Sequence, residues 1–254
     1  MVEKNLKVRL DTLLVGRGIA NSRERAQAMI LAGNVLVNEQ KIEKSGAAVD
    51  EHVEIRLLGE QLKYVSRGGL KLEKALDHWR IDVTGKVCLD IGASTGGFTD
   101  CLLQRGAARV IAVDTGRGQI DSGLRQDSRV RLREKTNARF LTAEQVGEKA
   151  DLVVMDVSFI SATLVLPAVI AAAIPPAKAD RRGRQVIVLV KPQFEVGREL
   201  VGKGGIVRDA AAQTAAVEKV RQVLLGLGCH EIDVIESPIL RTEGNREFLL
   251  FGRL

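Results

Sequence analysis

The sequence predicts an α/β fold, in which helices flank a mostly parallel sheet, preceded by a small α+β domain. Short apolar strands alternate with helical segments from Val87 onward, which is the order that builds a parallel sheet. A glycine-rich turn directly follows the first of these strands. Residues 1–60 instead carry two short helical segments and a few short strands, enough for one small domain.

The first strand of the predicted sheet and the turn after it form the central motif of the chain. Val87–Ile91 is a short apolar run that predicts a buried parallel strand. A helix follows over residues 98–104, and Arg109–Val113 forms a second strand. Strand, glycine turn, helix and strand in this order make the first half of a Rossmann-like sheet. The turn itself carries Gly92, Ser94, Gly96 and Gly97.

Two acids flank this motif and indicate which nucleotide it binds. The dinucleotide fingerprint has glycine where this chain has Ser94, so the turn makes no obvious provision for a pyrophosphate. Asp90 would repel a phosphate but suits a cationic amino-acid group, and Asp114 suits the two hydroxyls of a ribose. Asn137 follows a third strand over residues 129–132, a position for adenine contacts. The motif therefore predicts S-adenosylmethionine as cofactor; the alternative is an α/β turn that binds no ligand.

The composition indicates what class of protein this is and what kind of partner it binds. The chain has 254 residues, 45% of them hydrophobic and 28% charged, which is ordinary for a globular protein. A net charge of +6 and a pI of about 9.4 favour a polyanionic partner, whereas only 3% aromatic residues argue against base stacking as the main contact. The sequence contains no apolar run long enough to span a membrane and no metal-ligand pattern among its three cysteines. We expect a cytoplasmic protein with no metal.

The small N-terminal domain has a basic surface. Helices are predicted over residues 8–15 and 23–32, the second capped by Asn21 and Ser22, with strands at Val35–Val37 and residues 53–57. A solvated charged surface is the commoner meaning of such basic residues. Those in and around the two helices are Arg17, Arg23, Arg25, Lys41 and Lys44.

The order of residues 7–57 resembles the S4-type RNA-binding domain. The resemblance rests on Arg9-Leu10-Asp11, Ser22-Arg23, Gly33 and Val37-Asn38, among others. It implies that Arg17, Ser22, Arg23, Arg25 and Lys44 face RNA phosphates. Glu39 departs from the family, which often has Asn-Gly at this turn, and this makes the turn less favourable.

Further strands and helices complete the predicted sheet. Strands are expected over residues 151–155 and at Gln185–Val190, and an edge hairpin over residues 231–236 and 247–251. Helices are expected over residues 67–79, 163–174 and 209–225, and a long glycine-rich loop over residues 193–208.

The carboxyl ends of parallel strands gather the functional residues of such sheets. Here they supply Asp156 and Lys191 in addition to Asp90 and Asp114. An acid beside a lysine can be a plain structural ion pair. The sharper hypothesis is methyl transfer to a ribose hydroxyl, which needs a group that takes its proton.

Other chemistries have weaker support. Residues 197–204 nearly spell a P-loop, but Gly204 stands where the Mg²⁺-binding Ser or Thr belongs. The chain lacks the Asn-Pro-Pro-Tyr or Asp-Pro-Pro-Tyr string of base amino-group methylation and the Pro-Cys or Thr-Cys nucleophile of pyrimidine carbon methylation.

The whole chain resembles the TlyA family of ribosomal RNA cytidine 2'-O-methyltransferases, often labelled hemolysins. The motifs that carry this resemblance are Tyr64-Val-Ser-Arg-Gly-Gly-Leu-Lys71, residues 90–99 and 153–159, Leu189-Val-Lys-Pro-Gln-Phe-Glu195, Gly204-Gly-Ile-Val-Arg-Asp209, and Glu236-Ser-Pro with Gly244-Asn-Arg-Glu247. The related heat-shock RNA methyltransferases use a Lys-Asp-Lys-Glu tetrad. Matched by motif, the tetrad here is Lys71, Asp156, Lys191 and Glu247.

The resemblance implies a role for each of these side chains. Lys191 is the base or proton acceptor, Asp156 and Glu247 are its electrostatic partners, and Lys71 is the second cation; Asp156 also borders the cofactor. Lys71 would lower the pKa of Lys191 and the two acids would raise it, so a neutral base and a charged orienting group both stay open.

The resemblance also predicts domains and partners. We expect an S4-like RNA-binding domain over residues 1–60, a linker over 61–66, and an FtsJ-like methyltransferase domain over 67–254, with Arg67 also contacting RNA. The expected partner is ribosomal RNA or a ribosomal subunit, with no obligatory protein partner. A non-catalytic RNA-binding factor and a pore-forming hemolysin are the alternatives; the intact motifs argue against the first and the missing membrane span against the second.

Overall fold

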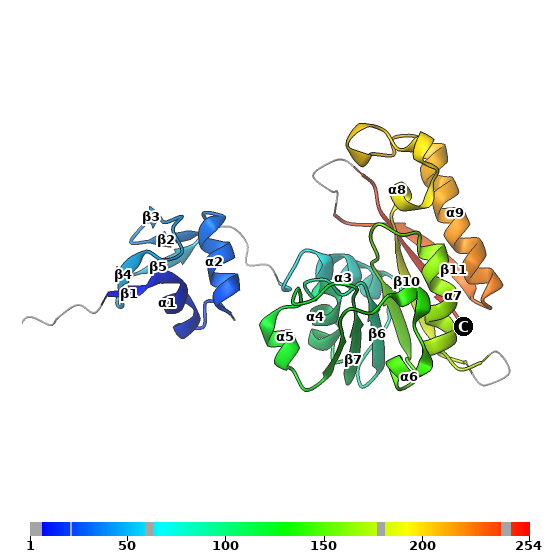
Figure 1. Ribbon diagram of the computed structural model, residues 1–254, viewed down its shortest axis with the longest axis horizontal. Coiled ribbons are helices and arrows are strands. Elements are labelled where there is room, and N and C mark those ends of the chain that lie inside the picture. Colours follow the sequence, from blue (N-terminus) through cyan, green and yellow to red (C-terminus); the bar gives the residue numbers. More distant parts are fainter. Residues whose placement is uncertain (1–6, 21, 59–62, 177–180, 240–244) are drawn as a thin grey trace, which may run out of the picture. The chain divides into compact units, whose positions relative to one another are not determined.

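The computed structural model describes residues 7–20, 22–58, 63–176, 181–239 and 245–254. The chain divides into two compact units (Figure 1). The first comprises Met1–Leu62 with Asp121–Gly123, and the second comprises Lys63–Ile120 with Leu124–Leu254. We refer to them as the N-terminal unit and the C-terminal unit and describe each by itself.

Two helices and two small antiparallel sheets form the N-terminal unit. The helices are α1 (Leu10–Gly16) and α2 (Arg23–Leu31). One sheet pairs β1 (Lys7–Arg9) with β4 (Ala48–Asp50), and the other has the order β3-β2-β5, from Gln40–Lys41, Val35–Val37 and Ile55–Leu57. Apolar side chains of both helices and of β2 fill the core between them: Leu10, Leu14, Ala26, Ile30 and Val35.

The two helices of this unit begin close to where the sequence predicts. The first predicted helix began too early, because Lys7–Arg9 is a strand that pairs with β4 and the helix starts only at Leu10. Ser22 caps α2 as predicted, since its hydroxyl accepts the Arg25 backbone N–H at 3.2 Å, whereas Asn21 lies outside the described residues.

The turn between β2 and β3 has the unfavourable chemistry that the sequence indicates. Asn38 and Glu39 both have left-handed backbones, with φ of 47° and 64°. Glycine is the residue that tolerates this conformation, and glutamate rarely does. A bidentate contact from Arg56 to the Glu39 carboxylate holds the turn on its neighbouring strand β5.

A seven-stranded sheet forms the centre of the C-terminal unit, with the order β11-β12-β10-β9-β6-β7-β8. Its parallel part contains the predicted strands, which the structure confirms: β6 (Val87–Ile91), β7 (Arg109–Val113), β8 (Val130–Arg133), β9 (Leu152–Met155) and β10 (Gln185–Val190). The predicted edge hairpin is also present, as β11 (His230–Glu236) and β12 (Phe248–Arg253). The fold is the expected Rossmann-like sheet.

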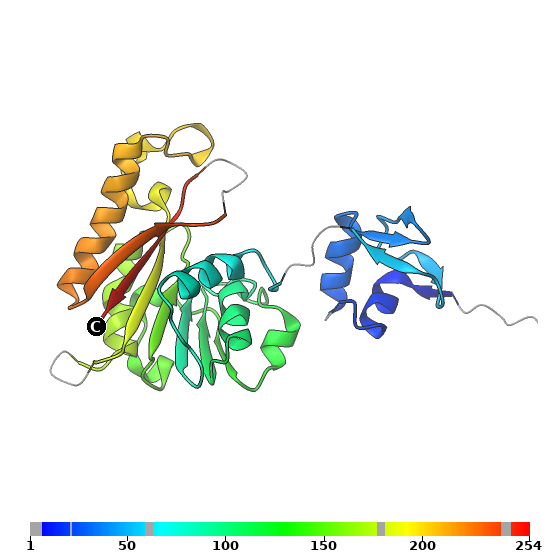
Figure 2. The same ribbon diagram turned by 180° about the vertical axis from the view of Figure 1, so that it is seen from behind.

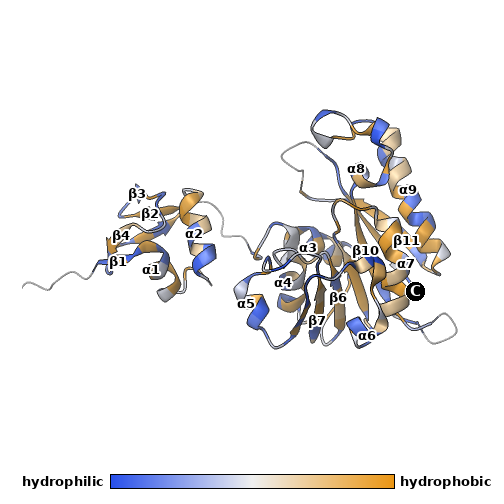
Figure 3. Ribbon diagram, viewed as in Figure 1, coloured by the Kyte–Doolittle hydropathy of each residue, from blue (hydrophilic) through white to orange (hydrophobic). Residues whose placement is uncertain are grey.

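Helices cover both faces of this sheet. Side chains of α3 (Gly68–His78), α4 (Gly97–Gln104) and α5 (Ser122–Gln126) pack on one face, and those of α6 (Ala143–Val146), α7 (Ala162–Ala173) and α9 (Ala210–Gly226) on the other. Figures 1 and 2 show these two layers from opposite sides, and Figure 3 shows hydrophobic residues along the strands between them. The predicted loop after β10 contains a short helix, α8 (Pro192–Glu195), and two 3₁₀ turns.

The strand order fixes where a ligand can bind. From β6 the chain first builds β7 and β8 on one side and then crosses to build β9 and β10 on the other. The loops after β6 and β9 therefore lead away from each other, which opens a crevice at the carboxyl ends of these strands. In the parts of the chain that the structure describes, no helix combines the length and apolarity needed to cross a bilayer.

Candidate active site

Two adjoining pockets open at this crevice. The larger has a volume of about 570 Å³ and reaches from the end of β6 to the segment after β9. The smaller, of about 510 Å³, lies between the glycine turn after β6 and the start of α3. Gly92, Ser94 and Asp156 line both pockets, so a ligand in one can meet a group bound in the other.

The larger pocket has the polar groups that a nucleoside needs. Asp114 lines it and accepts backbone N–H groups from Ser94 at 2.8 Å and Gly116 at 2.6 Å, one on each carboxylate oxygen. Each oxygen keeps capacity for a further donor, such as a ribose hydroxyl. Asn137 lines the same pocket and accepts the Arg139 N–H at 3.0 Å. Apolar side chains supply the rest of the wall, including Ile91, Val113, Ala138, Ile160 and Val165.

Asp90 lies apart from these groups. Its side chain is fully buried and lines neither pocket. Thr99 Oγ1 donates to Asp90 Oδ2 at 2.7 Å, while Oδ1 has no hydrogen-bond partner among the described residues. Burial raises the pKa of Asp90 to about 7, the Thr99 hydrogen bond opposes this shift, and the nearby carboxylates of Asp156 and Asp114 add to it. An incompletely paired buried carboxylate is a group that a cationic ligand would stabilise.

The glycines of the turn are required by its packing. Gly92 has a φ of +84°, and a Cβ there would lie 2.4 Å from the Asp156 carbonyl oxygen. Gly97 contacts the start of α3 so closely that a Cβ would lie 2.3 Å from Ser66 Oγ. Ser94 adopts a left-handed backbone without being glycine, with a φ of 49°. These close approaches bring the ends of β6, β9 and α3 together around the crevice.

The four predicted tetrad residues form two ion pairs. Lys71 Nζ lies 2.5 Å from Glu247 Oε2, and Lys191 Nζ lies 2.5 Å from Asp156 Oδ1. Lys191 Nζ also donates to Ser158 Oγ at 2.7 Å. The side chains of Lys71, Lys191 and Glu247 are buried, and Asp156 is largely so. Buried charges are stable only when they are paired in this way.

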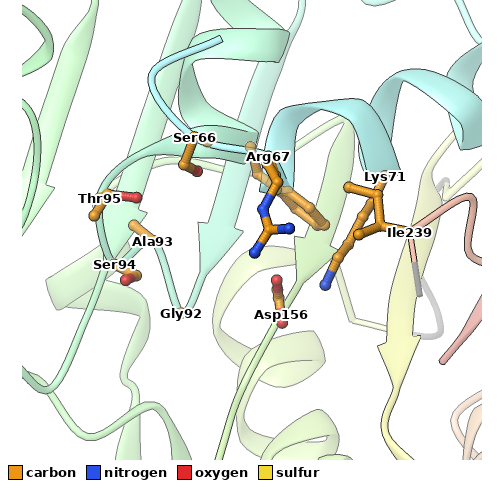
Figure 4. A pocket seen from close by; sticks show the side chains of 12 residues that line it. Ser66, Arg67, Lys71, Gly92, Ala93, Ser94, Thr95, Asp156 and Ile239 are labelled. Atoms are coloured by element: carbon orange, nitrogen blue, oxygen red, sulfur yellow. The ribbon is translucent and has the colours of Figure 1, made fainter. Parts of the chain in front are cut away.

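The topology explains why residues so far apart in sequence meet here. Asp156 and Lys191 directly follow β9 and β10, which are parallel neighbours. Glu247 directly precedes β12, which runs antiparallel to β10 with Val190 opposite Phe248, so the start of β12 lies at the same edge. Lys71 comes from the first turns of α3 and lines the smaller pocket with Asp156. Figure 4 shows Lys71 and Arg67 extending toward Asp156.

The predicted RNA-facing residues of the N-terminal unit are in different environments. Arg17 donates to the backbone carbonyl of Val53 at 2.7 Å and to that of Glu51. Arg23 pairs with Asp11 at 3.1 Å, and Lys41 with Glu43 at 2.8 Å. Ser22 uses its hydroxyl to cap α2. Arg25 is half-buried and Lys44 is exposed.

Asp11 organises part of this surface, a role that the sequence did not indicate. Its buried carboxylate accepts from Arg9, Arg23 and Gln27 side chains and from the Thr12 backbone N–H. The Arg9 hydrogen bonds hold the pKa of Asp11 well below its usual range. Both guanidiniums are about half exposed, so Asp11 fixes two cations at the surface.

Site residues that the sequence analysis left unassigned follow β9. Ser158 contacts Lys191, and Phe159 lines the larger pocket with 92% of its surface exposed. Phe159 has a left-handed backbone with a φ of 64°, and its ring centroid lies 5.4 Å from that of Phe194. Their position in the sequence could have indicated this role, because Ser158 and Phe159 belong to the segment that directly follows strand β9. Among the described residues no three His, Cys, Asp or Glu side chains gather as a metal site.

Comparisons with known proteins agree with this geometry. Residues 64–254 match the model of the FtsJ-like methyltransferase family, and residues 8–55 match the S4 domain. TlyA of Mycobacterium tuberculosis, named a 16S/23S rRNA (cytidine-2'-O)-methyltransferase, is 44% identical over 97% of this chain and 90% of that protein. YqxC of Bacillus subtilis, a candidate rRNA methyltransferase, is 45% identical over 96% of this chain and 85% of that protein.

A solved structure leads to the same family. It is a hemolysin-like protein from Streptococcus thermophilus, with a TM-score of 0.72 and 41% identity over 98% of this chain and 89% of that one. The expected S4 domain and FtsJ-like methyltransferase domain are thus confirmed. The chain belongs to the TlyA family of FtsJ-like methyltransferases.

Proposed function

We infer that this protein uses S-adenosylmethionine to methylate the ribose 2'-hydroxyl of a cytidine in ribosomal RNA. The observation that carries the inference is the convergence of two buried lysine–carboxylate pairs, Lys191–Asp156 and Lys71–Glu247, beside a nucleoside-sized pocket. The tuberculosis relative is named for cytidine methylation of both 16S and 23S rRNA, which supports cytidine as the target in the RNA of either subunit.

The larger pocket fits the cofactor. Asp114 would bind the ribose hydroxyls, and Asn137 with the apolar wall would hold the adenine. Asp90 lines neither pocket, but its Oδ1 has no hydrogen-bond partner among the described residues, and it would pair with the ammonium group. Gly92, Ser94, Gly96 and Gly97 form the turn along which the cofactor would lie. When bound, S-adenosylmethionine supplies an already activated methyl group.

The smaller pocket would hold the acceptor ribose. Lys191 Nζ either takes the hydroxyl proton or donates to the hydroxyl oxygen as negative charge develops on it. Asp156, which lines the smaller pocket, and Ser158 fix the position of Lys191. Glu247 does the same for Lys71, which lines this pocket together with Arg67. Because the methyl group of the cofactor is already activated, the protein would raise the rate mainly by holding the reactants close together and by stabilising charge.

We assign RNA affinity to residues 1–60 and chemistry to residues 67–254, with 61–66 as the linker. The S4 domain, with Arg25 and Lys44 and the guanidiniums held by Asp11, would bind phosphates of the ribosomal RNA. Arg67 is exposed and lines the smaller pocket, where it would meet the phosphate of the target nucleotide. Action on ribosomal RNA would place the protein in the cytoplasm.

The test is methylation of ribosomal subunits taken from a strain that lacks this protein. Purified protein and S-adenosylmethionine should add 2'-O-methyl groups at discrete cytidines, which can be mapped by resistance of the neighbouring phosphodiester to alkaline hydrolysis. Calorimetric titration with the cofactor distinguishes the proposed enzyme from the alternative, a non-catalytic RNA-binding factor. Absence of both cofactor binding and methylation would favour that alternative.

A further inference from the structure

Two segments carry the Lys191–Asp156 pair, and they contact each other repeatedly. Residues 156–162 lead from β9 to α7, and residues 191–195 form the turn and the short helix α8 after β10. Three contacts join them near the pocket: the ion pair itself, the Lys191–Ser158 hydrogen bond, and the ring contact between Phe159 and Phe194. A further contact lies at the far end of both segments, at Glu195.

Glu195 connects α8 to the start of α7. It is 5% exposed, its Oε1 accepts the Ala162 backbone N–H at 2.7 Å, and its Oε2 accepts the Ser161 hydroxyl. Ser161 is the N-cap of α7 and accepts the Thr163 N–H at 3.2 Å, so the glutamate completes the capping of this twelve-residue helix. Burial raises the pKa of Glu195, and its bonds to Ser161 and Ala162 and the nearby Lys219 oppose that shift.

The surroundings of Glu195 show that it links the segment after β10 to the start of α7. Helix α8 has only four residues, too few to be stable alone. Lys219 of α9 donates to the Glu195 backbone carbonyl at 2.8 Å, which fixes the end of α8 from a second side. Strand pairing, with Val188 opposite Met155, holds the two segments at their other end. Lys191 and Asp156 thus lie between two fixed points, the sheet and Glu195.

We propose that Glu195 is a positioning residue for methyl transfer, which keeps the segments after β9 and β10 at the spacing that places Lys191 against Asp156 and the acceptor hydroxyl. The proposal rests on the proposed function and adds to it a residue outside both pockets. Loss of the link would let α8 separate from α7, and a displacement of about 1 Å at reacting groups can lower a rate by roughly 100-fold.

The test compares variants of the full-length protein in steady-state methylation of ribosomal subunits. Glu195→Ala leaves the Ala162 N–H and the Ser161 hydroxyl without their partner, and kcat should fall by about 10- to 100-fold. Affinity for S-adenosylmethionine should change by less than about threefold, because Asp114 and the glycine turn follow other strands. Glu195→Gln can still accept from Ala162 and can donate to Ser161, so its kcat should stay within about threefold of the wild type.

Controls separate positioning from a general loss of stability. Glu199→Ala removes an exposed glutamate four residues further along the chain, in the 3₁₀ turn Arg198–Leu200, and should leave kcat unchanged. If Glu195→Ala does not fold, Ser161→Ala, which removes one of the two contacts, should still lower kcat by a few-fold. Normal kcat in Glu195→Ala, or an equal loss in Glu195→Gln, would overturn the positioning role. Inactivity of the wild type on ribosomal RNA would instead count against the proposed function itself.

Discussion

Among the described residues, the N-terminal and C-terminal units each bury one aspartate completely, and the two behave in opposite ways. Asp11 accepts hydrogen bonds from Arg9, Arg23, Gln27 and Thr12, and its pKa lies well below the usual range. Asp90 accepts one, from Thr99, and burial raises its pKa to about 7. A buried carboxylate with a full set of donors stabilises the fold, whereas one with an unpaired oxygen can still accept a further donor.

Exposed and buried ion pairs also differ in their consequences. In the N-terminal unit Arg56–Glu39 and Lys41–Glu43 are exposed to solvent, and such pairs contribute little to stability. In the C-terminal unit the Lys191–Asp156 pair is largely buried; Asp156 lines both pockets, and Lys191 lies behind it, outside both linings. Removing one member of a buried pair leaves an uncompensated charge. Substitutions in a buried pair such as Lys191–Asp156 should therefore affect activity more than substitutions in an exposed pair.

The largest effect is expected at Lys191. Lys191→Ala should lower methyl transfer by at least about 100-fold, because either a proton acceptor or a stabilising charge is lost at the hydroxyl. Lys191→Arg keeps a charge but cannot act as a base, so it should fail as well if lysine is the base. The measurement is incorporation of labelled methyl groups into ribosomal subunits.

The control for this variant is Lys74→Ala, which removes an exposed lysine of α3 near Lys71 and should leave turnover unchanged. Calorimetry should show that Lys191→Ala still binds S-adenosylmethionine, since Asp90, Gly92 and Asp114 remain. Near-normal turnover of Lys191→Ala on ribosomal RNA would remove Lys191 from the mechanism and the tetrad assignment with it.

Removal of residues 1–60 should give the next largest effect, on RNA binding and not on the cofactor. Loss of the basic surface should weaken affinity for ribosomal RNA on the order of 100-fold at low salt and flatten the dependence of affinity on salt concentration. Filter binding across a salt series measures both quantities. Affinity for S-adenosylmethionine should remain nearly the same, and its loss in the truncated protein would contradict the proposed division of labour.

The sequence could predict the sheet and the elements around it because their signals are local. Apolar strands, the glycine turn and the Asp209 cap of α9 all follow from neighbouring residues. The pairing within the site is not local. Lys71 and Glu247 are 176 residues apart and meet only because β12 inserts antiparallel beside β10. The resemblance to the family identified both residues, but secondary-structure propensity could not predict that they pair with each other.

The roles of Asp11 and Glu195 could not be predicted for the same reason. A charged residue in a helical segment is usually exposed, and nothing in its neighbours shows that the fold buries it. The contrast between Asp11 and Asp90 likewise depends on donors that only the tertiary structure brings near. Only the tertiary structure therefore shows which buried carboxylates are fully paired.

A smaller effect, on stability, is expected at Asp11. Asp11→Ala removes the acceptor of two charged donors, Arg9 and Arg23, and of neutral donors on Gln27 and Thr12, and it should destabilise the N-terminal unit by about 2 kcal/mol. Residues 1–60 contain no Phe, Trp or Tyr, so hydrogen exchange of the amides of α1 and α2 is the suitable measurement. Glu54→Ala, at an exposed position, is the matched control and should change exchange little. Unchanged protection in Asp11→Ala would show that the network is not structural.

The smallest effect is the pH dependence of cofactor binding through Asp90. The raised pKa, about 7 against an ordinary value of 3.8, means that the free protein holds Asp90 protonated at pH 6 and ionised at pH 8. An ammonium group binds only the ionised form, so affinity for S-adenosylmethionine should be about tenfold weaker at pH 6 than at pH 8. Calorimetry across this range measures the change, and Asp90→Asn should abolish it.

The same group predicts the opposite trend for stability without cofactor. Because its pKa is higher in the folded protein than in the unfolded chain, the contribution of Asp90 to stability is fully present below pH 4 and is lost as the pH rises through about 7. Asp90→Asn, which is neutral at every pH, should therefore melt at a higher temperature than the wild type at pH 8 when no cofactor is added. The cofactor affinity of the wild type could instead be independent of pH, and Asp90→Asn could melt at the same temperature as the wild type. Asp90 would then be a structural partner of Thr99, and its role would be like that of Asp11.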